Sequence, residues 1–277
     1  MPPIADLARP MHRLAGYRIN PRNSAPWRSS DITAIRLRRI DDETEHLILA
    51  PWGTTLGWVD FAPDGSHLSY MVIRDTGVEL WVVNVVTGTP RPLTDASLNA
   101  TWGNPCEWLS DSSGVLCRFR MSARGAPPTP PRAPVGPRIQ ESDGQLSPVR
   151  TYQDLLSNPY DEALFEYHFT SQIATVALAT GSRTTIGRPG LFARVSGAPD
   201  SQHLLVVRLK RPFSWLVPAT RFARSVEVWN RRGDVVELAD LPVADGIPIG
   251  GVTTTPRMHR WNPTQPATLV WSEAQDG

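Results

Sequence analysis

Chemically capable side chains are concentrated in the segment RLKRPFSWLVPATRFARS. Its basic residues surround three aromatic ones: Arg208, Lys210, Arg211, Arg221 and Arg224 lie around Phe213, Trp215 and Phe222. A guanidinium that aromatic packing holds in place can bind a carboxylate through two parallel hydrogen bonds. The segment is therefore a candidate carboxylate-binding site. The alternative is that these arginines pair with nearby acidic residues or with the edges of strands.

The remaining reactive residue types do not form a recognisable catalytic set. No window matches G-x-S-x-G, the turn that presents a hydrolase serine. His67 and His203 occupy equivalent positions in an internal repeat, which favours a structural or solvent-facing role at a turn over general-base catalysis. Neither an H-x-x-x-H pair nor a zinc-like Cys/His spacing is present. We therefore predict no catalytic residue, no metal site and no cofactor in this sequence.

The two cysteines flank a predicted tight turn at LSDSSG. If Leu109 pairs with Val115 across this hairpin, Glu107 rather than Cys106 lies opposite Cys117. A hairpin disulfide is then disfavoured, and we predict two reduced, partly buried thiols.

The composition indicates many short strands and no highly charged partner. The 277 residues include 27 prolines, 20 glycines and 10 tryptophans, which favours strands and turns over long helices. The net charge is +1 and the charges are dispersed, so the sequence calls for neither nucleic acid nor an anionic membrane. No transmembrane run or signal peptide is evident. As written, the sequence predicts a cytoplasmic product, with the compartment left open.

An internal repeat defines the elements that must position these residues. DFAPDGSHLSYMV and SGAPDSQHLLVVR share a turn and a following apolar strand, and EWLSDSSGVLCRF and RWNPTQPATLVWS fit the same frame. The first interval between these turns matches a propeller blade of about 40 to 50 residues, and the longer intervals match a blade with an insertion. Further strand pairs close at Gly88, Gly181 and Gly233, which gives four strands in each unit.

The fold predicted from this repeat is all-β, an incomplete β-propeller of about three four-stranded antiparallel blades with partial blades at both ends. In the repeat frame, Phe61, Trp108 and Trp261 should occupy equivalent inward positions. The predicted boundaries are 1–55 for a lead-in and outer strands, 56–101 for a blade, 102–191 for a blade with a Pro-rich insertion at about 120–168, 192–250 for a blade with the Arg/aromatic insertion at about 208–224, and 251–277 for the first hairpin of a further blade. Within the first insertion, YQDLLSNPYDEALFEYH predicts one or two short helical turns broken by Pro159.

Five stretches resemble, in order, the amino-terminal propeller of glutamyl endopeptidases, a branch of the prolyl oligopeptidase family. They are PPIADLARPMHRLAG, SARGAPPTPPRAPVGPRIQ, RTYQDLLSNPYDEALFEYHFTSQI, KRPFSWLVPATRF and WSEAQDG. The resemblance covers essentially the whole chain. It implies a propeller that caps an α/β-hydrolase domain, whose Ser, Asp and His lie near the carboxyl end of a much longer protein. The chain alone is then expected to be inactive.

The resemblance also implies a function for the Arg/aromatic segment. A propeller over an active site would gate and help select peptide substrates, and Arg211, Arg221 and Trp215 become candidate contacts to a glutamyl substrate. The expected partner is a peptide substrate, bound together with the missing catalytic domain, while open blade edges would favour self-association. The alternative is a stand-alone propeller that serves as a protein-interaction scaffold.

Overall fold

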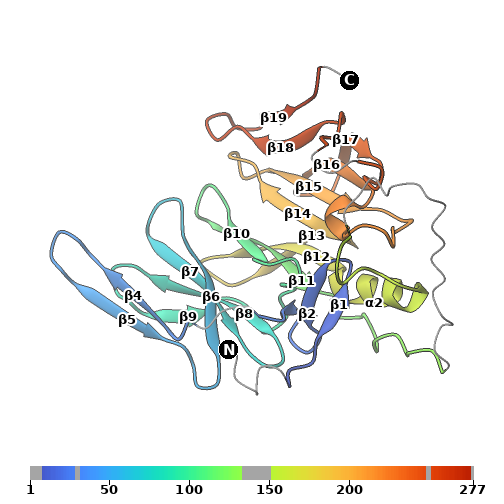
Figure 1. The fold of residues 1–277 in the computed structure, drawn as a ribbon. Coiled ribbons are helices and arrows are strands. Elements are labelled where there is room, and N and C mark those ends of the chain that lie inside the picture. The colour runs from blue at the N-terminus through green and yellow to red at the C-terminus, as the bar shows by residue number, and fades with distance from the viewer. Residues whose placement is uncertain (1–7, 29–31, 133–150, 248–250, 276–277) are drawn as a thin grey trace, which may run out of the picture.

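The computed structural model describes residues 8–28, 32–132, 151–247 and 251–275, and most of these lie in antiparallel strands. Three sheets have four strands each, ordered as they occur in the sequence (Figure 1). The first sheet contains β6 (Thr55–Phe61), β7 (His67–Ile73), β8 (Val78–Asn84) and β9 (Pro90–Pro92). The second contains β10 (Cys106–Trp108), β11 (Gly114–Arg120), β12 (Ser171–Ala177) and β13 (Arg183–Gly190). The third contains β14 (Phe192–Gly197), β15 (His203–Leu209), β16 (Arg224–Asn230) and β17 (Val235–Leu241).

Smaller sheets flank this series. A two-stranded sheet, β4 (Ala34–Arg38) with β5 (Glu45–Leu49), precedes it in the sequence, and β18 (Arg257–Trp261) with β19 (Leu269–Ser272) follows it. A three-stranded sheet of β1 (His12–Leu14), β2 (Tyr17–Asn20) and β3 (Ala25–Pro26) was not predicted. The predicted fold class is confirmed: the protein is an incomplete β-propeller with three four-stranded blades and partial blades at both ends.

The repeated turn between the first and second strands also connects neighbouring blades. Gly65, Ser112 and Ser201 occupy the same turn position with φ values of 70°, 56° and 54°. Glycine adopts this left-handed region without strain, whereas serine does so at a cost. The Ser112 hydroxyl accepts a hydrogen bond from the Asp64 N–H (3.1 Å), and the Ser201 hydroxyl accepts one from the Asp111 N–H (3.2 Å). The two serines thus adopt an unfavourable backbone conformation, but their hydroxyl groups join neighbouring blades.

The prediction of two reduced cysteines is wrong, because Cys106 and Cys117 form a disulfide. Cys106 lies directly opposite Cys117 in the β10–β11 pair. The Leu109 N–H donates to the Gly114 carbonyl (3.0 Å), so Leu109 pairs one residue earlier than predicted. A shift of one residue changes every cross-strand partner in a hairpin, and this shift brings the two thiols together.

The prediction of three equivalent inward aromatic residues is correct in strand position for all three, and the predicted packing between sheets holds for Trp108 and Trp261 but not for Phe61. Phe61, Trp108 and Trp261 each end the first strand of a sheet, yet Phe61 is 54% exposed while Trp108 is 8% exposed. The Trp108 indole N–H donates to the Asp60 carbonyl of the preceding blade (3.4 Å), and Trp261 makes the same contact with Ser196 (3.1 Å). Trp108 and Trp261 each contact the first strand of the preceding sheet. The sheet that precedes Phe61 consists of β4 and β5, and its described residues include no such first strand for Phe61 to contact.

One side of the arc carries a separate apolar core. It forms where the β1–β3 sheet, helix α2 (Pro159–Phe169) and the short helix η1 (Ala219–Arg221) meet, opposite the repeated turns (Figure 1). Phe165, Phe169 and Phe222 are completely buried there. Both insertions therefore fold onto one face, although residues 133–150 of the Pro-rich insertion lie outside the described part of the chain.

Helix α2 corrects the prediction that Pro159 breaks the helix. Pro159 is instead its first residue, and the helix runs for 11 residues. Proline is tolerated in the first helical turn because the backbone N–H that it lacks has no intrahelical partner there. The Asn158 side chain caps the helix by accepting the Asp161 N–H (2.9 Å). Among the described residues, no helix is long and apolar enough to span a membrane.

Candidate functional site

Arg211 and Trp215 face helix α2. The Arg211 guanidinium binds both oxygens of Glu166 (2.7 and 2.9 Å) and one oxygen of Glu162 (2.6 Å). The Trp215 indole N–H donates to the other Glu162 oxygen (2.8 Å). The hydrogen bonds to Glu166, followed by the one to Glu162, raise the pKa of Arg211 above its ordinary value. These four residues form a clamp, here called the α2 clamp, that holds the Arg/aromatic insertion against the helix.

Arg221 lies in a different environment. Its Nη1 donates to the Ala244 carbonyl (3.1 Å), and its guanidinium carbon lies 5.8 Å from the centre of the Tyr152 ring. Arg221 also lines a cavity of about 1010 Å³. The structure therefore separates the three candidate residues: Arg211 and Trp215 bind acidic residues of α2, and Arg221 borders an open space.

This cavity, here called the arginine cleft, lies between the third blade and the segment that leads into β18. Four arginines from separate elements line it: Arg194 on β14, Arg221 on η1, Arg224 on β16 and Arg257 on β18. Apolar and aromatic groups complete the wall: Tyr17, Trp102, Val243 and Met258. Arg221 and Arg224 belong to the basic segment that the sequence shows, whereas Arg194 and Arg257 stand isolated in the sequence and were not predicted.

Backbone carbonyls orient these guanidinium groups. Arg194 Nη1 donates to the His259 carbonyl (3.0 Å), and Arg257 Nη1 donates to the Thr253 carbonyl (2.7 Å). Arg224 donates to the Phe222 carbonyl through Nε (3.0 Å) and to the Thr220 carbonyl through Nη2. Burial lowers the pKa of Arg224 below its ordinary value. The cleft thus presents positively charged groups that the chain itself holds in place.

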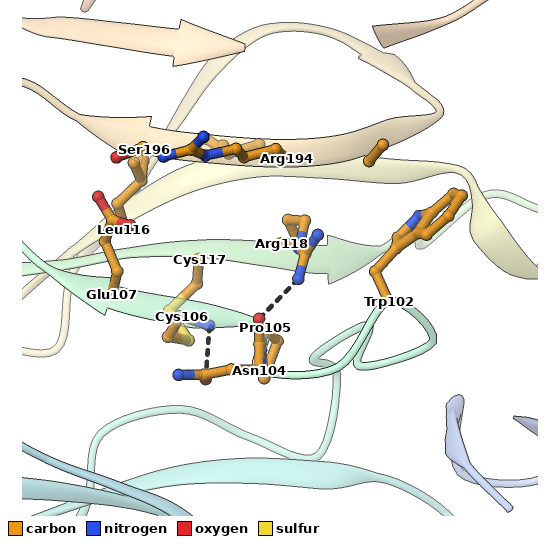
Figure 2. Close-up of a pocket in the computed structure, with 12 residues that line it drawn as sticks. Trp102, Asn104, Pro105, Cys106, Glu107, Leu116, Cys117, Arg118, Arg194 and Ser196 are labelled. Carbon is orange, nitrogen blue, oxygen red and sulfur yellow. Dashed lines mark hydrogen bonds between the residues drawn. A yellow bond between two sulfur atoms is a disulfide. The ribbon is translucent and has the colours of Figure 1, made fainter. Parts of the chain in front are cut away.

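A second, smaller cavity of about 260 Å³ lies between the second and third blades (Figure 2). Arg118 on β11 enters it from one blade and Arg194 on β14 from the other. Arg118 is 8% exposed and donates to the carbonyls of Asn104 (2.6 Å) and Phe192 (3.2 Å). Burial lowers the pKa of Arg118 to about 10. Trp102, Ala193 and Arg194 line both cavities, which therefore share a wall.

Glu107 is the acidic residue of the smaller cavity. It projects from β10 toward β14 (Figure 2) and accepts the Gly197 N–H of the next blade. Burial raises its pKa, while the hydrogen bond from Gly197 and the charges of Arg194 and Arg118 act in the opposite direction. Glu107 therefore supports a contact between blades and partly balances the two arginines that share its cavity.

The histidines do not assemble into a catalytic pair with a described acid or nucleophile at these cavities. His67 and His203 lie at the repeated turns, beside Ser66 and Asp200 respectively. His168 on α2 is 2% exposed, and neither ring nitrogen has a hydrogen-bond partner. Burial lowers the pKa of His168 to about 3. In the part of the chain that the structure describes, no three His, Cys, Asp or Glu residues lie close enough together to hold a metal ion.

Comparison with known proteins identifies relatives over the full length of the chain. No protein-family model matches the sequence. A protein named probable glutamyl endopeptidase, chloroplastic, from Oryza sativa subsp. japonica is 37% identical over 295 aligned residues, which cover 100% of this chain and 31% of that protein. The protein of the same name from Arabidopsis thaliana is 36% identical over 294 aligned residues, which cover 100% of this chain and 30% of that protein. The chain thus spans about a third of these relatives.

Solved structures with a similar fold include an acylaminoacyl peptidase from Pyrococcus horikoshii, which is 14% identical to this chain and superposes on it with a TM-score of 0.45. This match covers 75% of the present chain and 28% of the peptidase chain. The relatives with full-length coverage of this chain confirm the family that the five sequence stretches indicated. The protein is a β-propeller segment related along its whole length to the proteins named glutamyl endopeptidase.

Proposed function

We propose that this propeller segment gates access to a serine endopeptidase active site and helps to select its peptide substrates. The observation that carries the proposal is the 37% identity to a probable glutamyl endopeptidase along the whole chain. That relative is named for cleavage at glutamyl residues, and a glutamyl substrate needs a group that compensates its carboxylate. The arginine cleft offers such groups on the propeller side.

The geometry supports gating through the packing of the blades. Neighbouring blades are joined by the repeated turns and by the contacts of Trp108, Trp261 and Glu107. A folded protein cannot pass between sheets that are joined in this way, whereas a flexible peptide can enter a cavity between them. Such exclusion by size contributes to selectivity without any bond-breaking group on the propeller.

The three candidate substrate contacts differ in how easily a substrate carboxylate could reach them. Arg221 borders the arginine cleft, so a substrate carboxylate can reach it without rearrangement of the insertion. Arg211 and Trp215 would first have to release Glu162 and Glu166. We therefore propose Arg221 as the first of the three to contact substrate, and Arg211 and Trp215 as contacts that follow opening of the α2 clamp.

The test uses the complete product of the reading frame that contains this chain. We expect labelling of that product by a fluorophosphonate serine probe and cleavage of a flexible glutamyl peptide. The same peptide embedded in a stable folded domain should be cleaved at least a hundredfold more slowly. A product that takes up no probe and cleaves neither substrate would refute the peptidase assignment and favour an interaction scaffold. Equal cleavage of both substrates would refute gating.

Substrate selection is tested separately with Arg221→Met and Arg211→Met in the complete product. We expect Arg221→Met to reduce kcat/KM for glutamyl peptides at least tenfold and to leave kcat/KM for the matched glutaminyl peptides within twofold, because only the glutamyl substrate loses a charged hydrogen bond. Arg36→Met is the matched control, since Arg36 lies on β4 and pairs with Glu45. Unchanged glutamyl kcat/KM in both test variants would remove these residues from substrate binding.

A further inference from the structure

The arginines of the cleft contact backbone carbonyls, unlike the ion-paired arginines of the protein. Several arginines outside the cleft each have a carboxylate oxygen within 4.0 Å: Arg13, Arg18, Arg36, Arg38, Arg39, Arg74 and Arg211. Among the described residues, no carboxylate lies within that distance of Arg194, Arg221, Arg224 or Arg257. The cleft therefore gathers arginines whose charges the described part of the chain does not pair directly.

Most of the hydrogen-bonding capacity of these side chains remains available. A guanidinium carries five N–H donors. The contacts of Arg194, Arg221 and Arg257 to backbone carbonyls use one nitrogen each, and those of Arg224 use two. Each fork is thus held at one side by a carbonyl and keeps donors for an acceptor in the cleft. Such preorganisation lowers the entropic cost of binding.

The balance of charge along the wall favours an anionic occupant. Asp245 is the one carboxylate among the lining residues, against four guanidinium groups, so the lining carries a net charge of +3, which Glu107 of the adjoining smaller cavity offsets in part through Arg194. Burial lowers the pKa of His259 and raises that of Tyr17, which keeps both neutral at pH 7. Positive charge inside a walled cleft concentrates anions more strongly than the same charge on an open surface.

We propose that the arginine cleft binds acidic peptide segments and engages at least two carboxylates at once. The cavity volume of about 1010 Å³ matches the upper end of the range for pockets that hold a drug-sized ligand, so it can accept a short peptide rather than a single ion. Trp102, Val243 and Met258 provide apolar surface for the peptide backbone and side chains. The arginines come from four separate elements, β14, η1, β16 and β18, and all four line the same cavity.

This inference deepens the proposed function, because it names the class of substrate that the propeller would favour. It is tested by binding alone, on the 277-residue chain at protein concentrations below those at which it self-associates. The probes are a fluorescein-labelled peptide, Gly-Glu-Glu-Gly-Glu-Glu-Gly, and its counterpart with Gln in place of every Glu. In fluorescence anisotropy at 50 mM salt, we expect the Glu peptide to bind at least thirtyfold more tightly than the Gln peptide.

The decisive variant is the double substitution Arg194→Met/Arg257→Met, since neither residue belongs to the basic segment. Loss of two charged hydrogen-bonding groups should weaken binding of the Glu peptide at least thirtyfold. Arg36→Met/Arg38→Met on β4 is the control with the same loss of charge and should change affinity less than threefold. If the first variant fails to fold by circular dichroism, Arg194→Lys/Arg257→Lys retains the charge but loses the planar fork, and should weaken binding at least fivefold.

Four results would overturn the inference. Equal affinity for the two peptides would remove the requirement for carboxylates, and an equal loss in the control variant would show a nonspecific effect of net charge. Tighter binding of a single-stranded oligonucleotide of matched charge would assign the cleft to phosphate groups instead. If the chain fails to bind the Glu peptide while the complete product still rejects folded proteins, the acidic cleft is refuted and the gating function stands.

Discussion

Acidification should destabilise the protein through His168. This side chain is almost completely buried between α2 and β1, with its ring centroid 5.2 Å from that of His12. Burial is the main cause that lowers its pKa to about 3, and the charges of His12 and Arg124 act in the same direction. Tyr167 packs against the ring edge to face (5.0 Å), and Asp161 lies near enough to act on His12. No described carboxylate binds the His168 ring directly.

The sign of the effect follows from proton binding. A histidine with an ordinary pKa of about 6.5 in the unfolded chain binds a proton there before it does so in the folded protein. The contribution to stability is therefore fully present above pH 6.5 and is lost as pH falls from 6.5 toward 3. Each pH unit in this window costs about 1.4 kcal/mol, so the change from pH 7 to pH 5 should cost about 2 kcal/mol.

The assay is urea unfolding followed by tryptophan fluorescence at pH 7 and pH 5. We compare the change in unfolding free energy between the two pH values for the parent chain and for His168→Leu. The variant should lose about 2 kcal/mol less than the parent on acidification, because one buried titrating group is gone. His203→Gln is the control, since the His203 side chain is 41% exposed and contacts Asp200. An unaltered pH dependence in His168→Leu, or an NMR pKa for His168 near 6.5, would refute the reasoning.

Four further predictions concern the fold and its termini. Cys106→Ala/Cys117→Ala should lower the unfolding free energy by about 2 to 3 kcal/mol, measured in urea, because the crosslink closes a short loop; an unchanged midpoint would contradict this. Asn158→Ala should cost about 1 kcal/mol through loss of the α2 cap, whereas Asn158→Ser should restore most of it. The chain alone should take up no fluorophosphonate probe, and stoichiometric labelling would reverse the assignment of catalysis to another domain. The chain should self-associate at micromolar concentrations on gel filtration, because Leu49 on β5 and Trp271 on β19 are 67% and 52% exposed on partial blades; a monomer throughout would contradict this.

The blade architecture could be predicted because its signals are local and repeated. The turns at Asp64, Asp111 and Asp200 each place a carboxylate oxygen against the backbone N–H two residues ahead. A pattern of this kind identifies the turn and the strands on either side. The exact strand register is less accessible, as the Cys106–Cys117 pair shows, since one residue in the turn changes every partner.

The candidate site was predictable only in part, because its members come together through tertiary structure. Arg221 and Arg224 belong to a visible basic segment, but Arg194 and Arg257 reach the same cleft from β14 and β18. The length of helix α2 was predicted too short for a related reason. In the sequence Pro159 indicates a helix break, whereas in the structure Asn158 caps the helix and Pro159 is its first residue. Pairing of charges across elements likewise has no local signal, which left the clamp partners of Arg211 unidentified.

The hydrogen bonds that join the repeated turns to neighbouring blades all run the same way along the chain, from an earlier N–H to a later acceptor. The Asp64 N–H is satisfied by Ser112 of the second blade, the Asp111 N–H by Ser201 of the third, and the Asp200 N–H by the carbonyl of Pro266 in the following hairpin. Each turn is therefore completed by chain that is synthesised later. On the ribosome, the N–H at the tip of a newly formed blade donates only to water until the next blade emerges, so each blade should reach its final packing one blade behind synthesis.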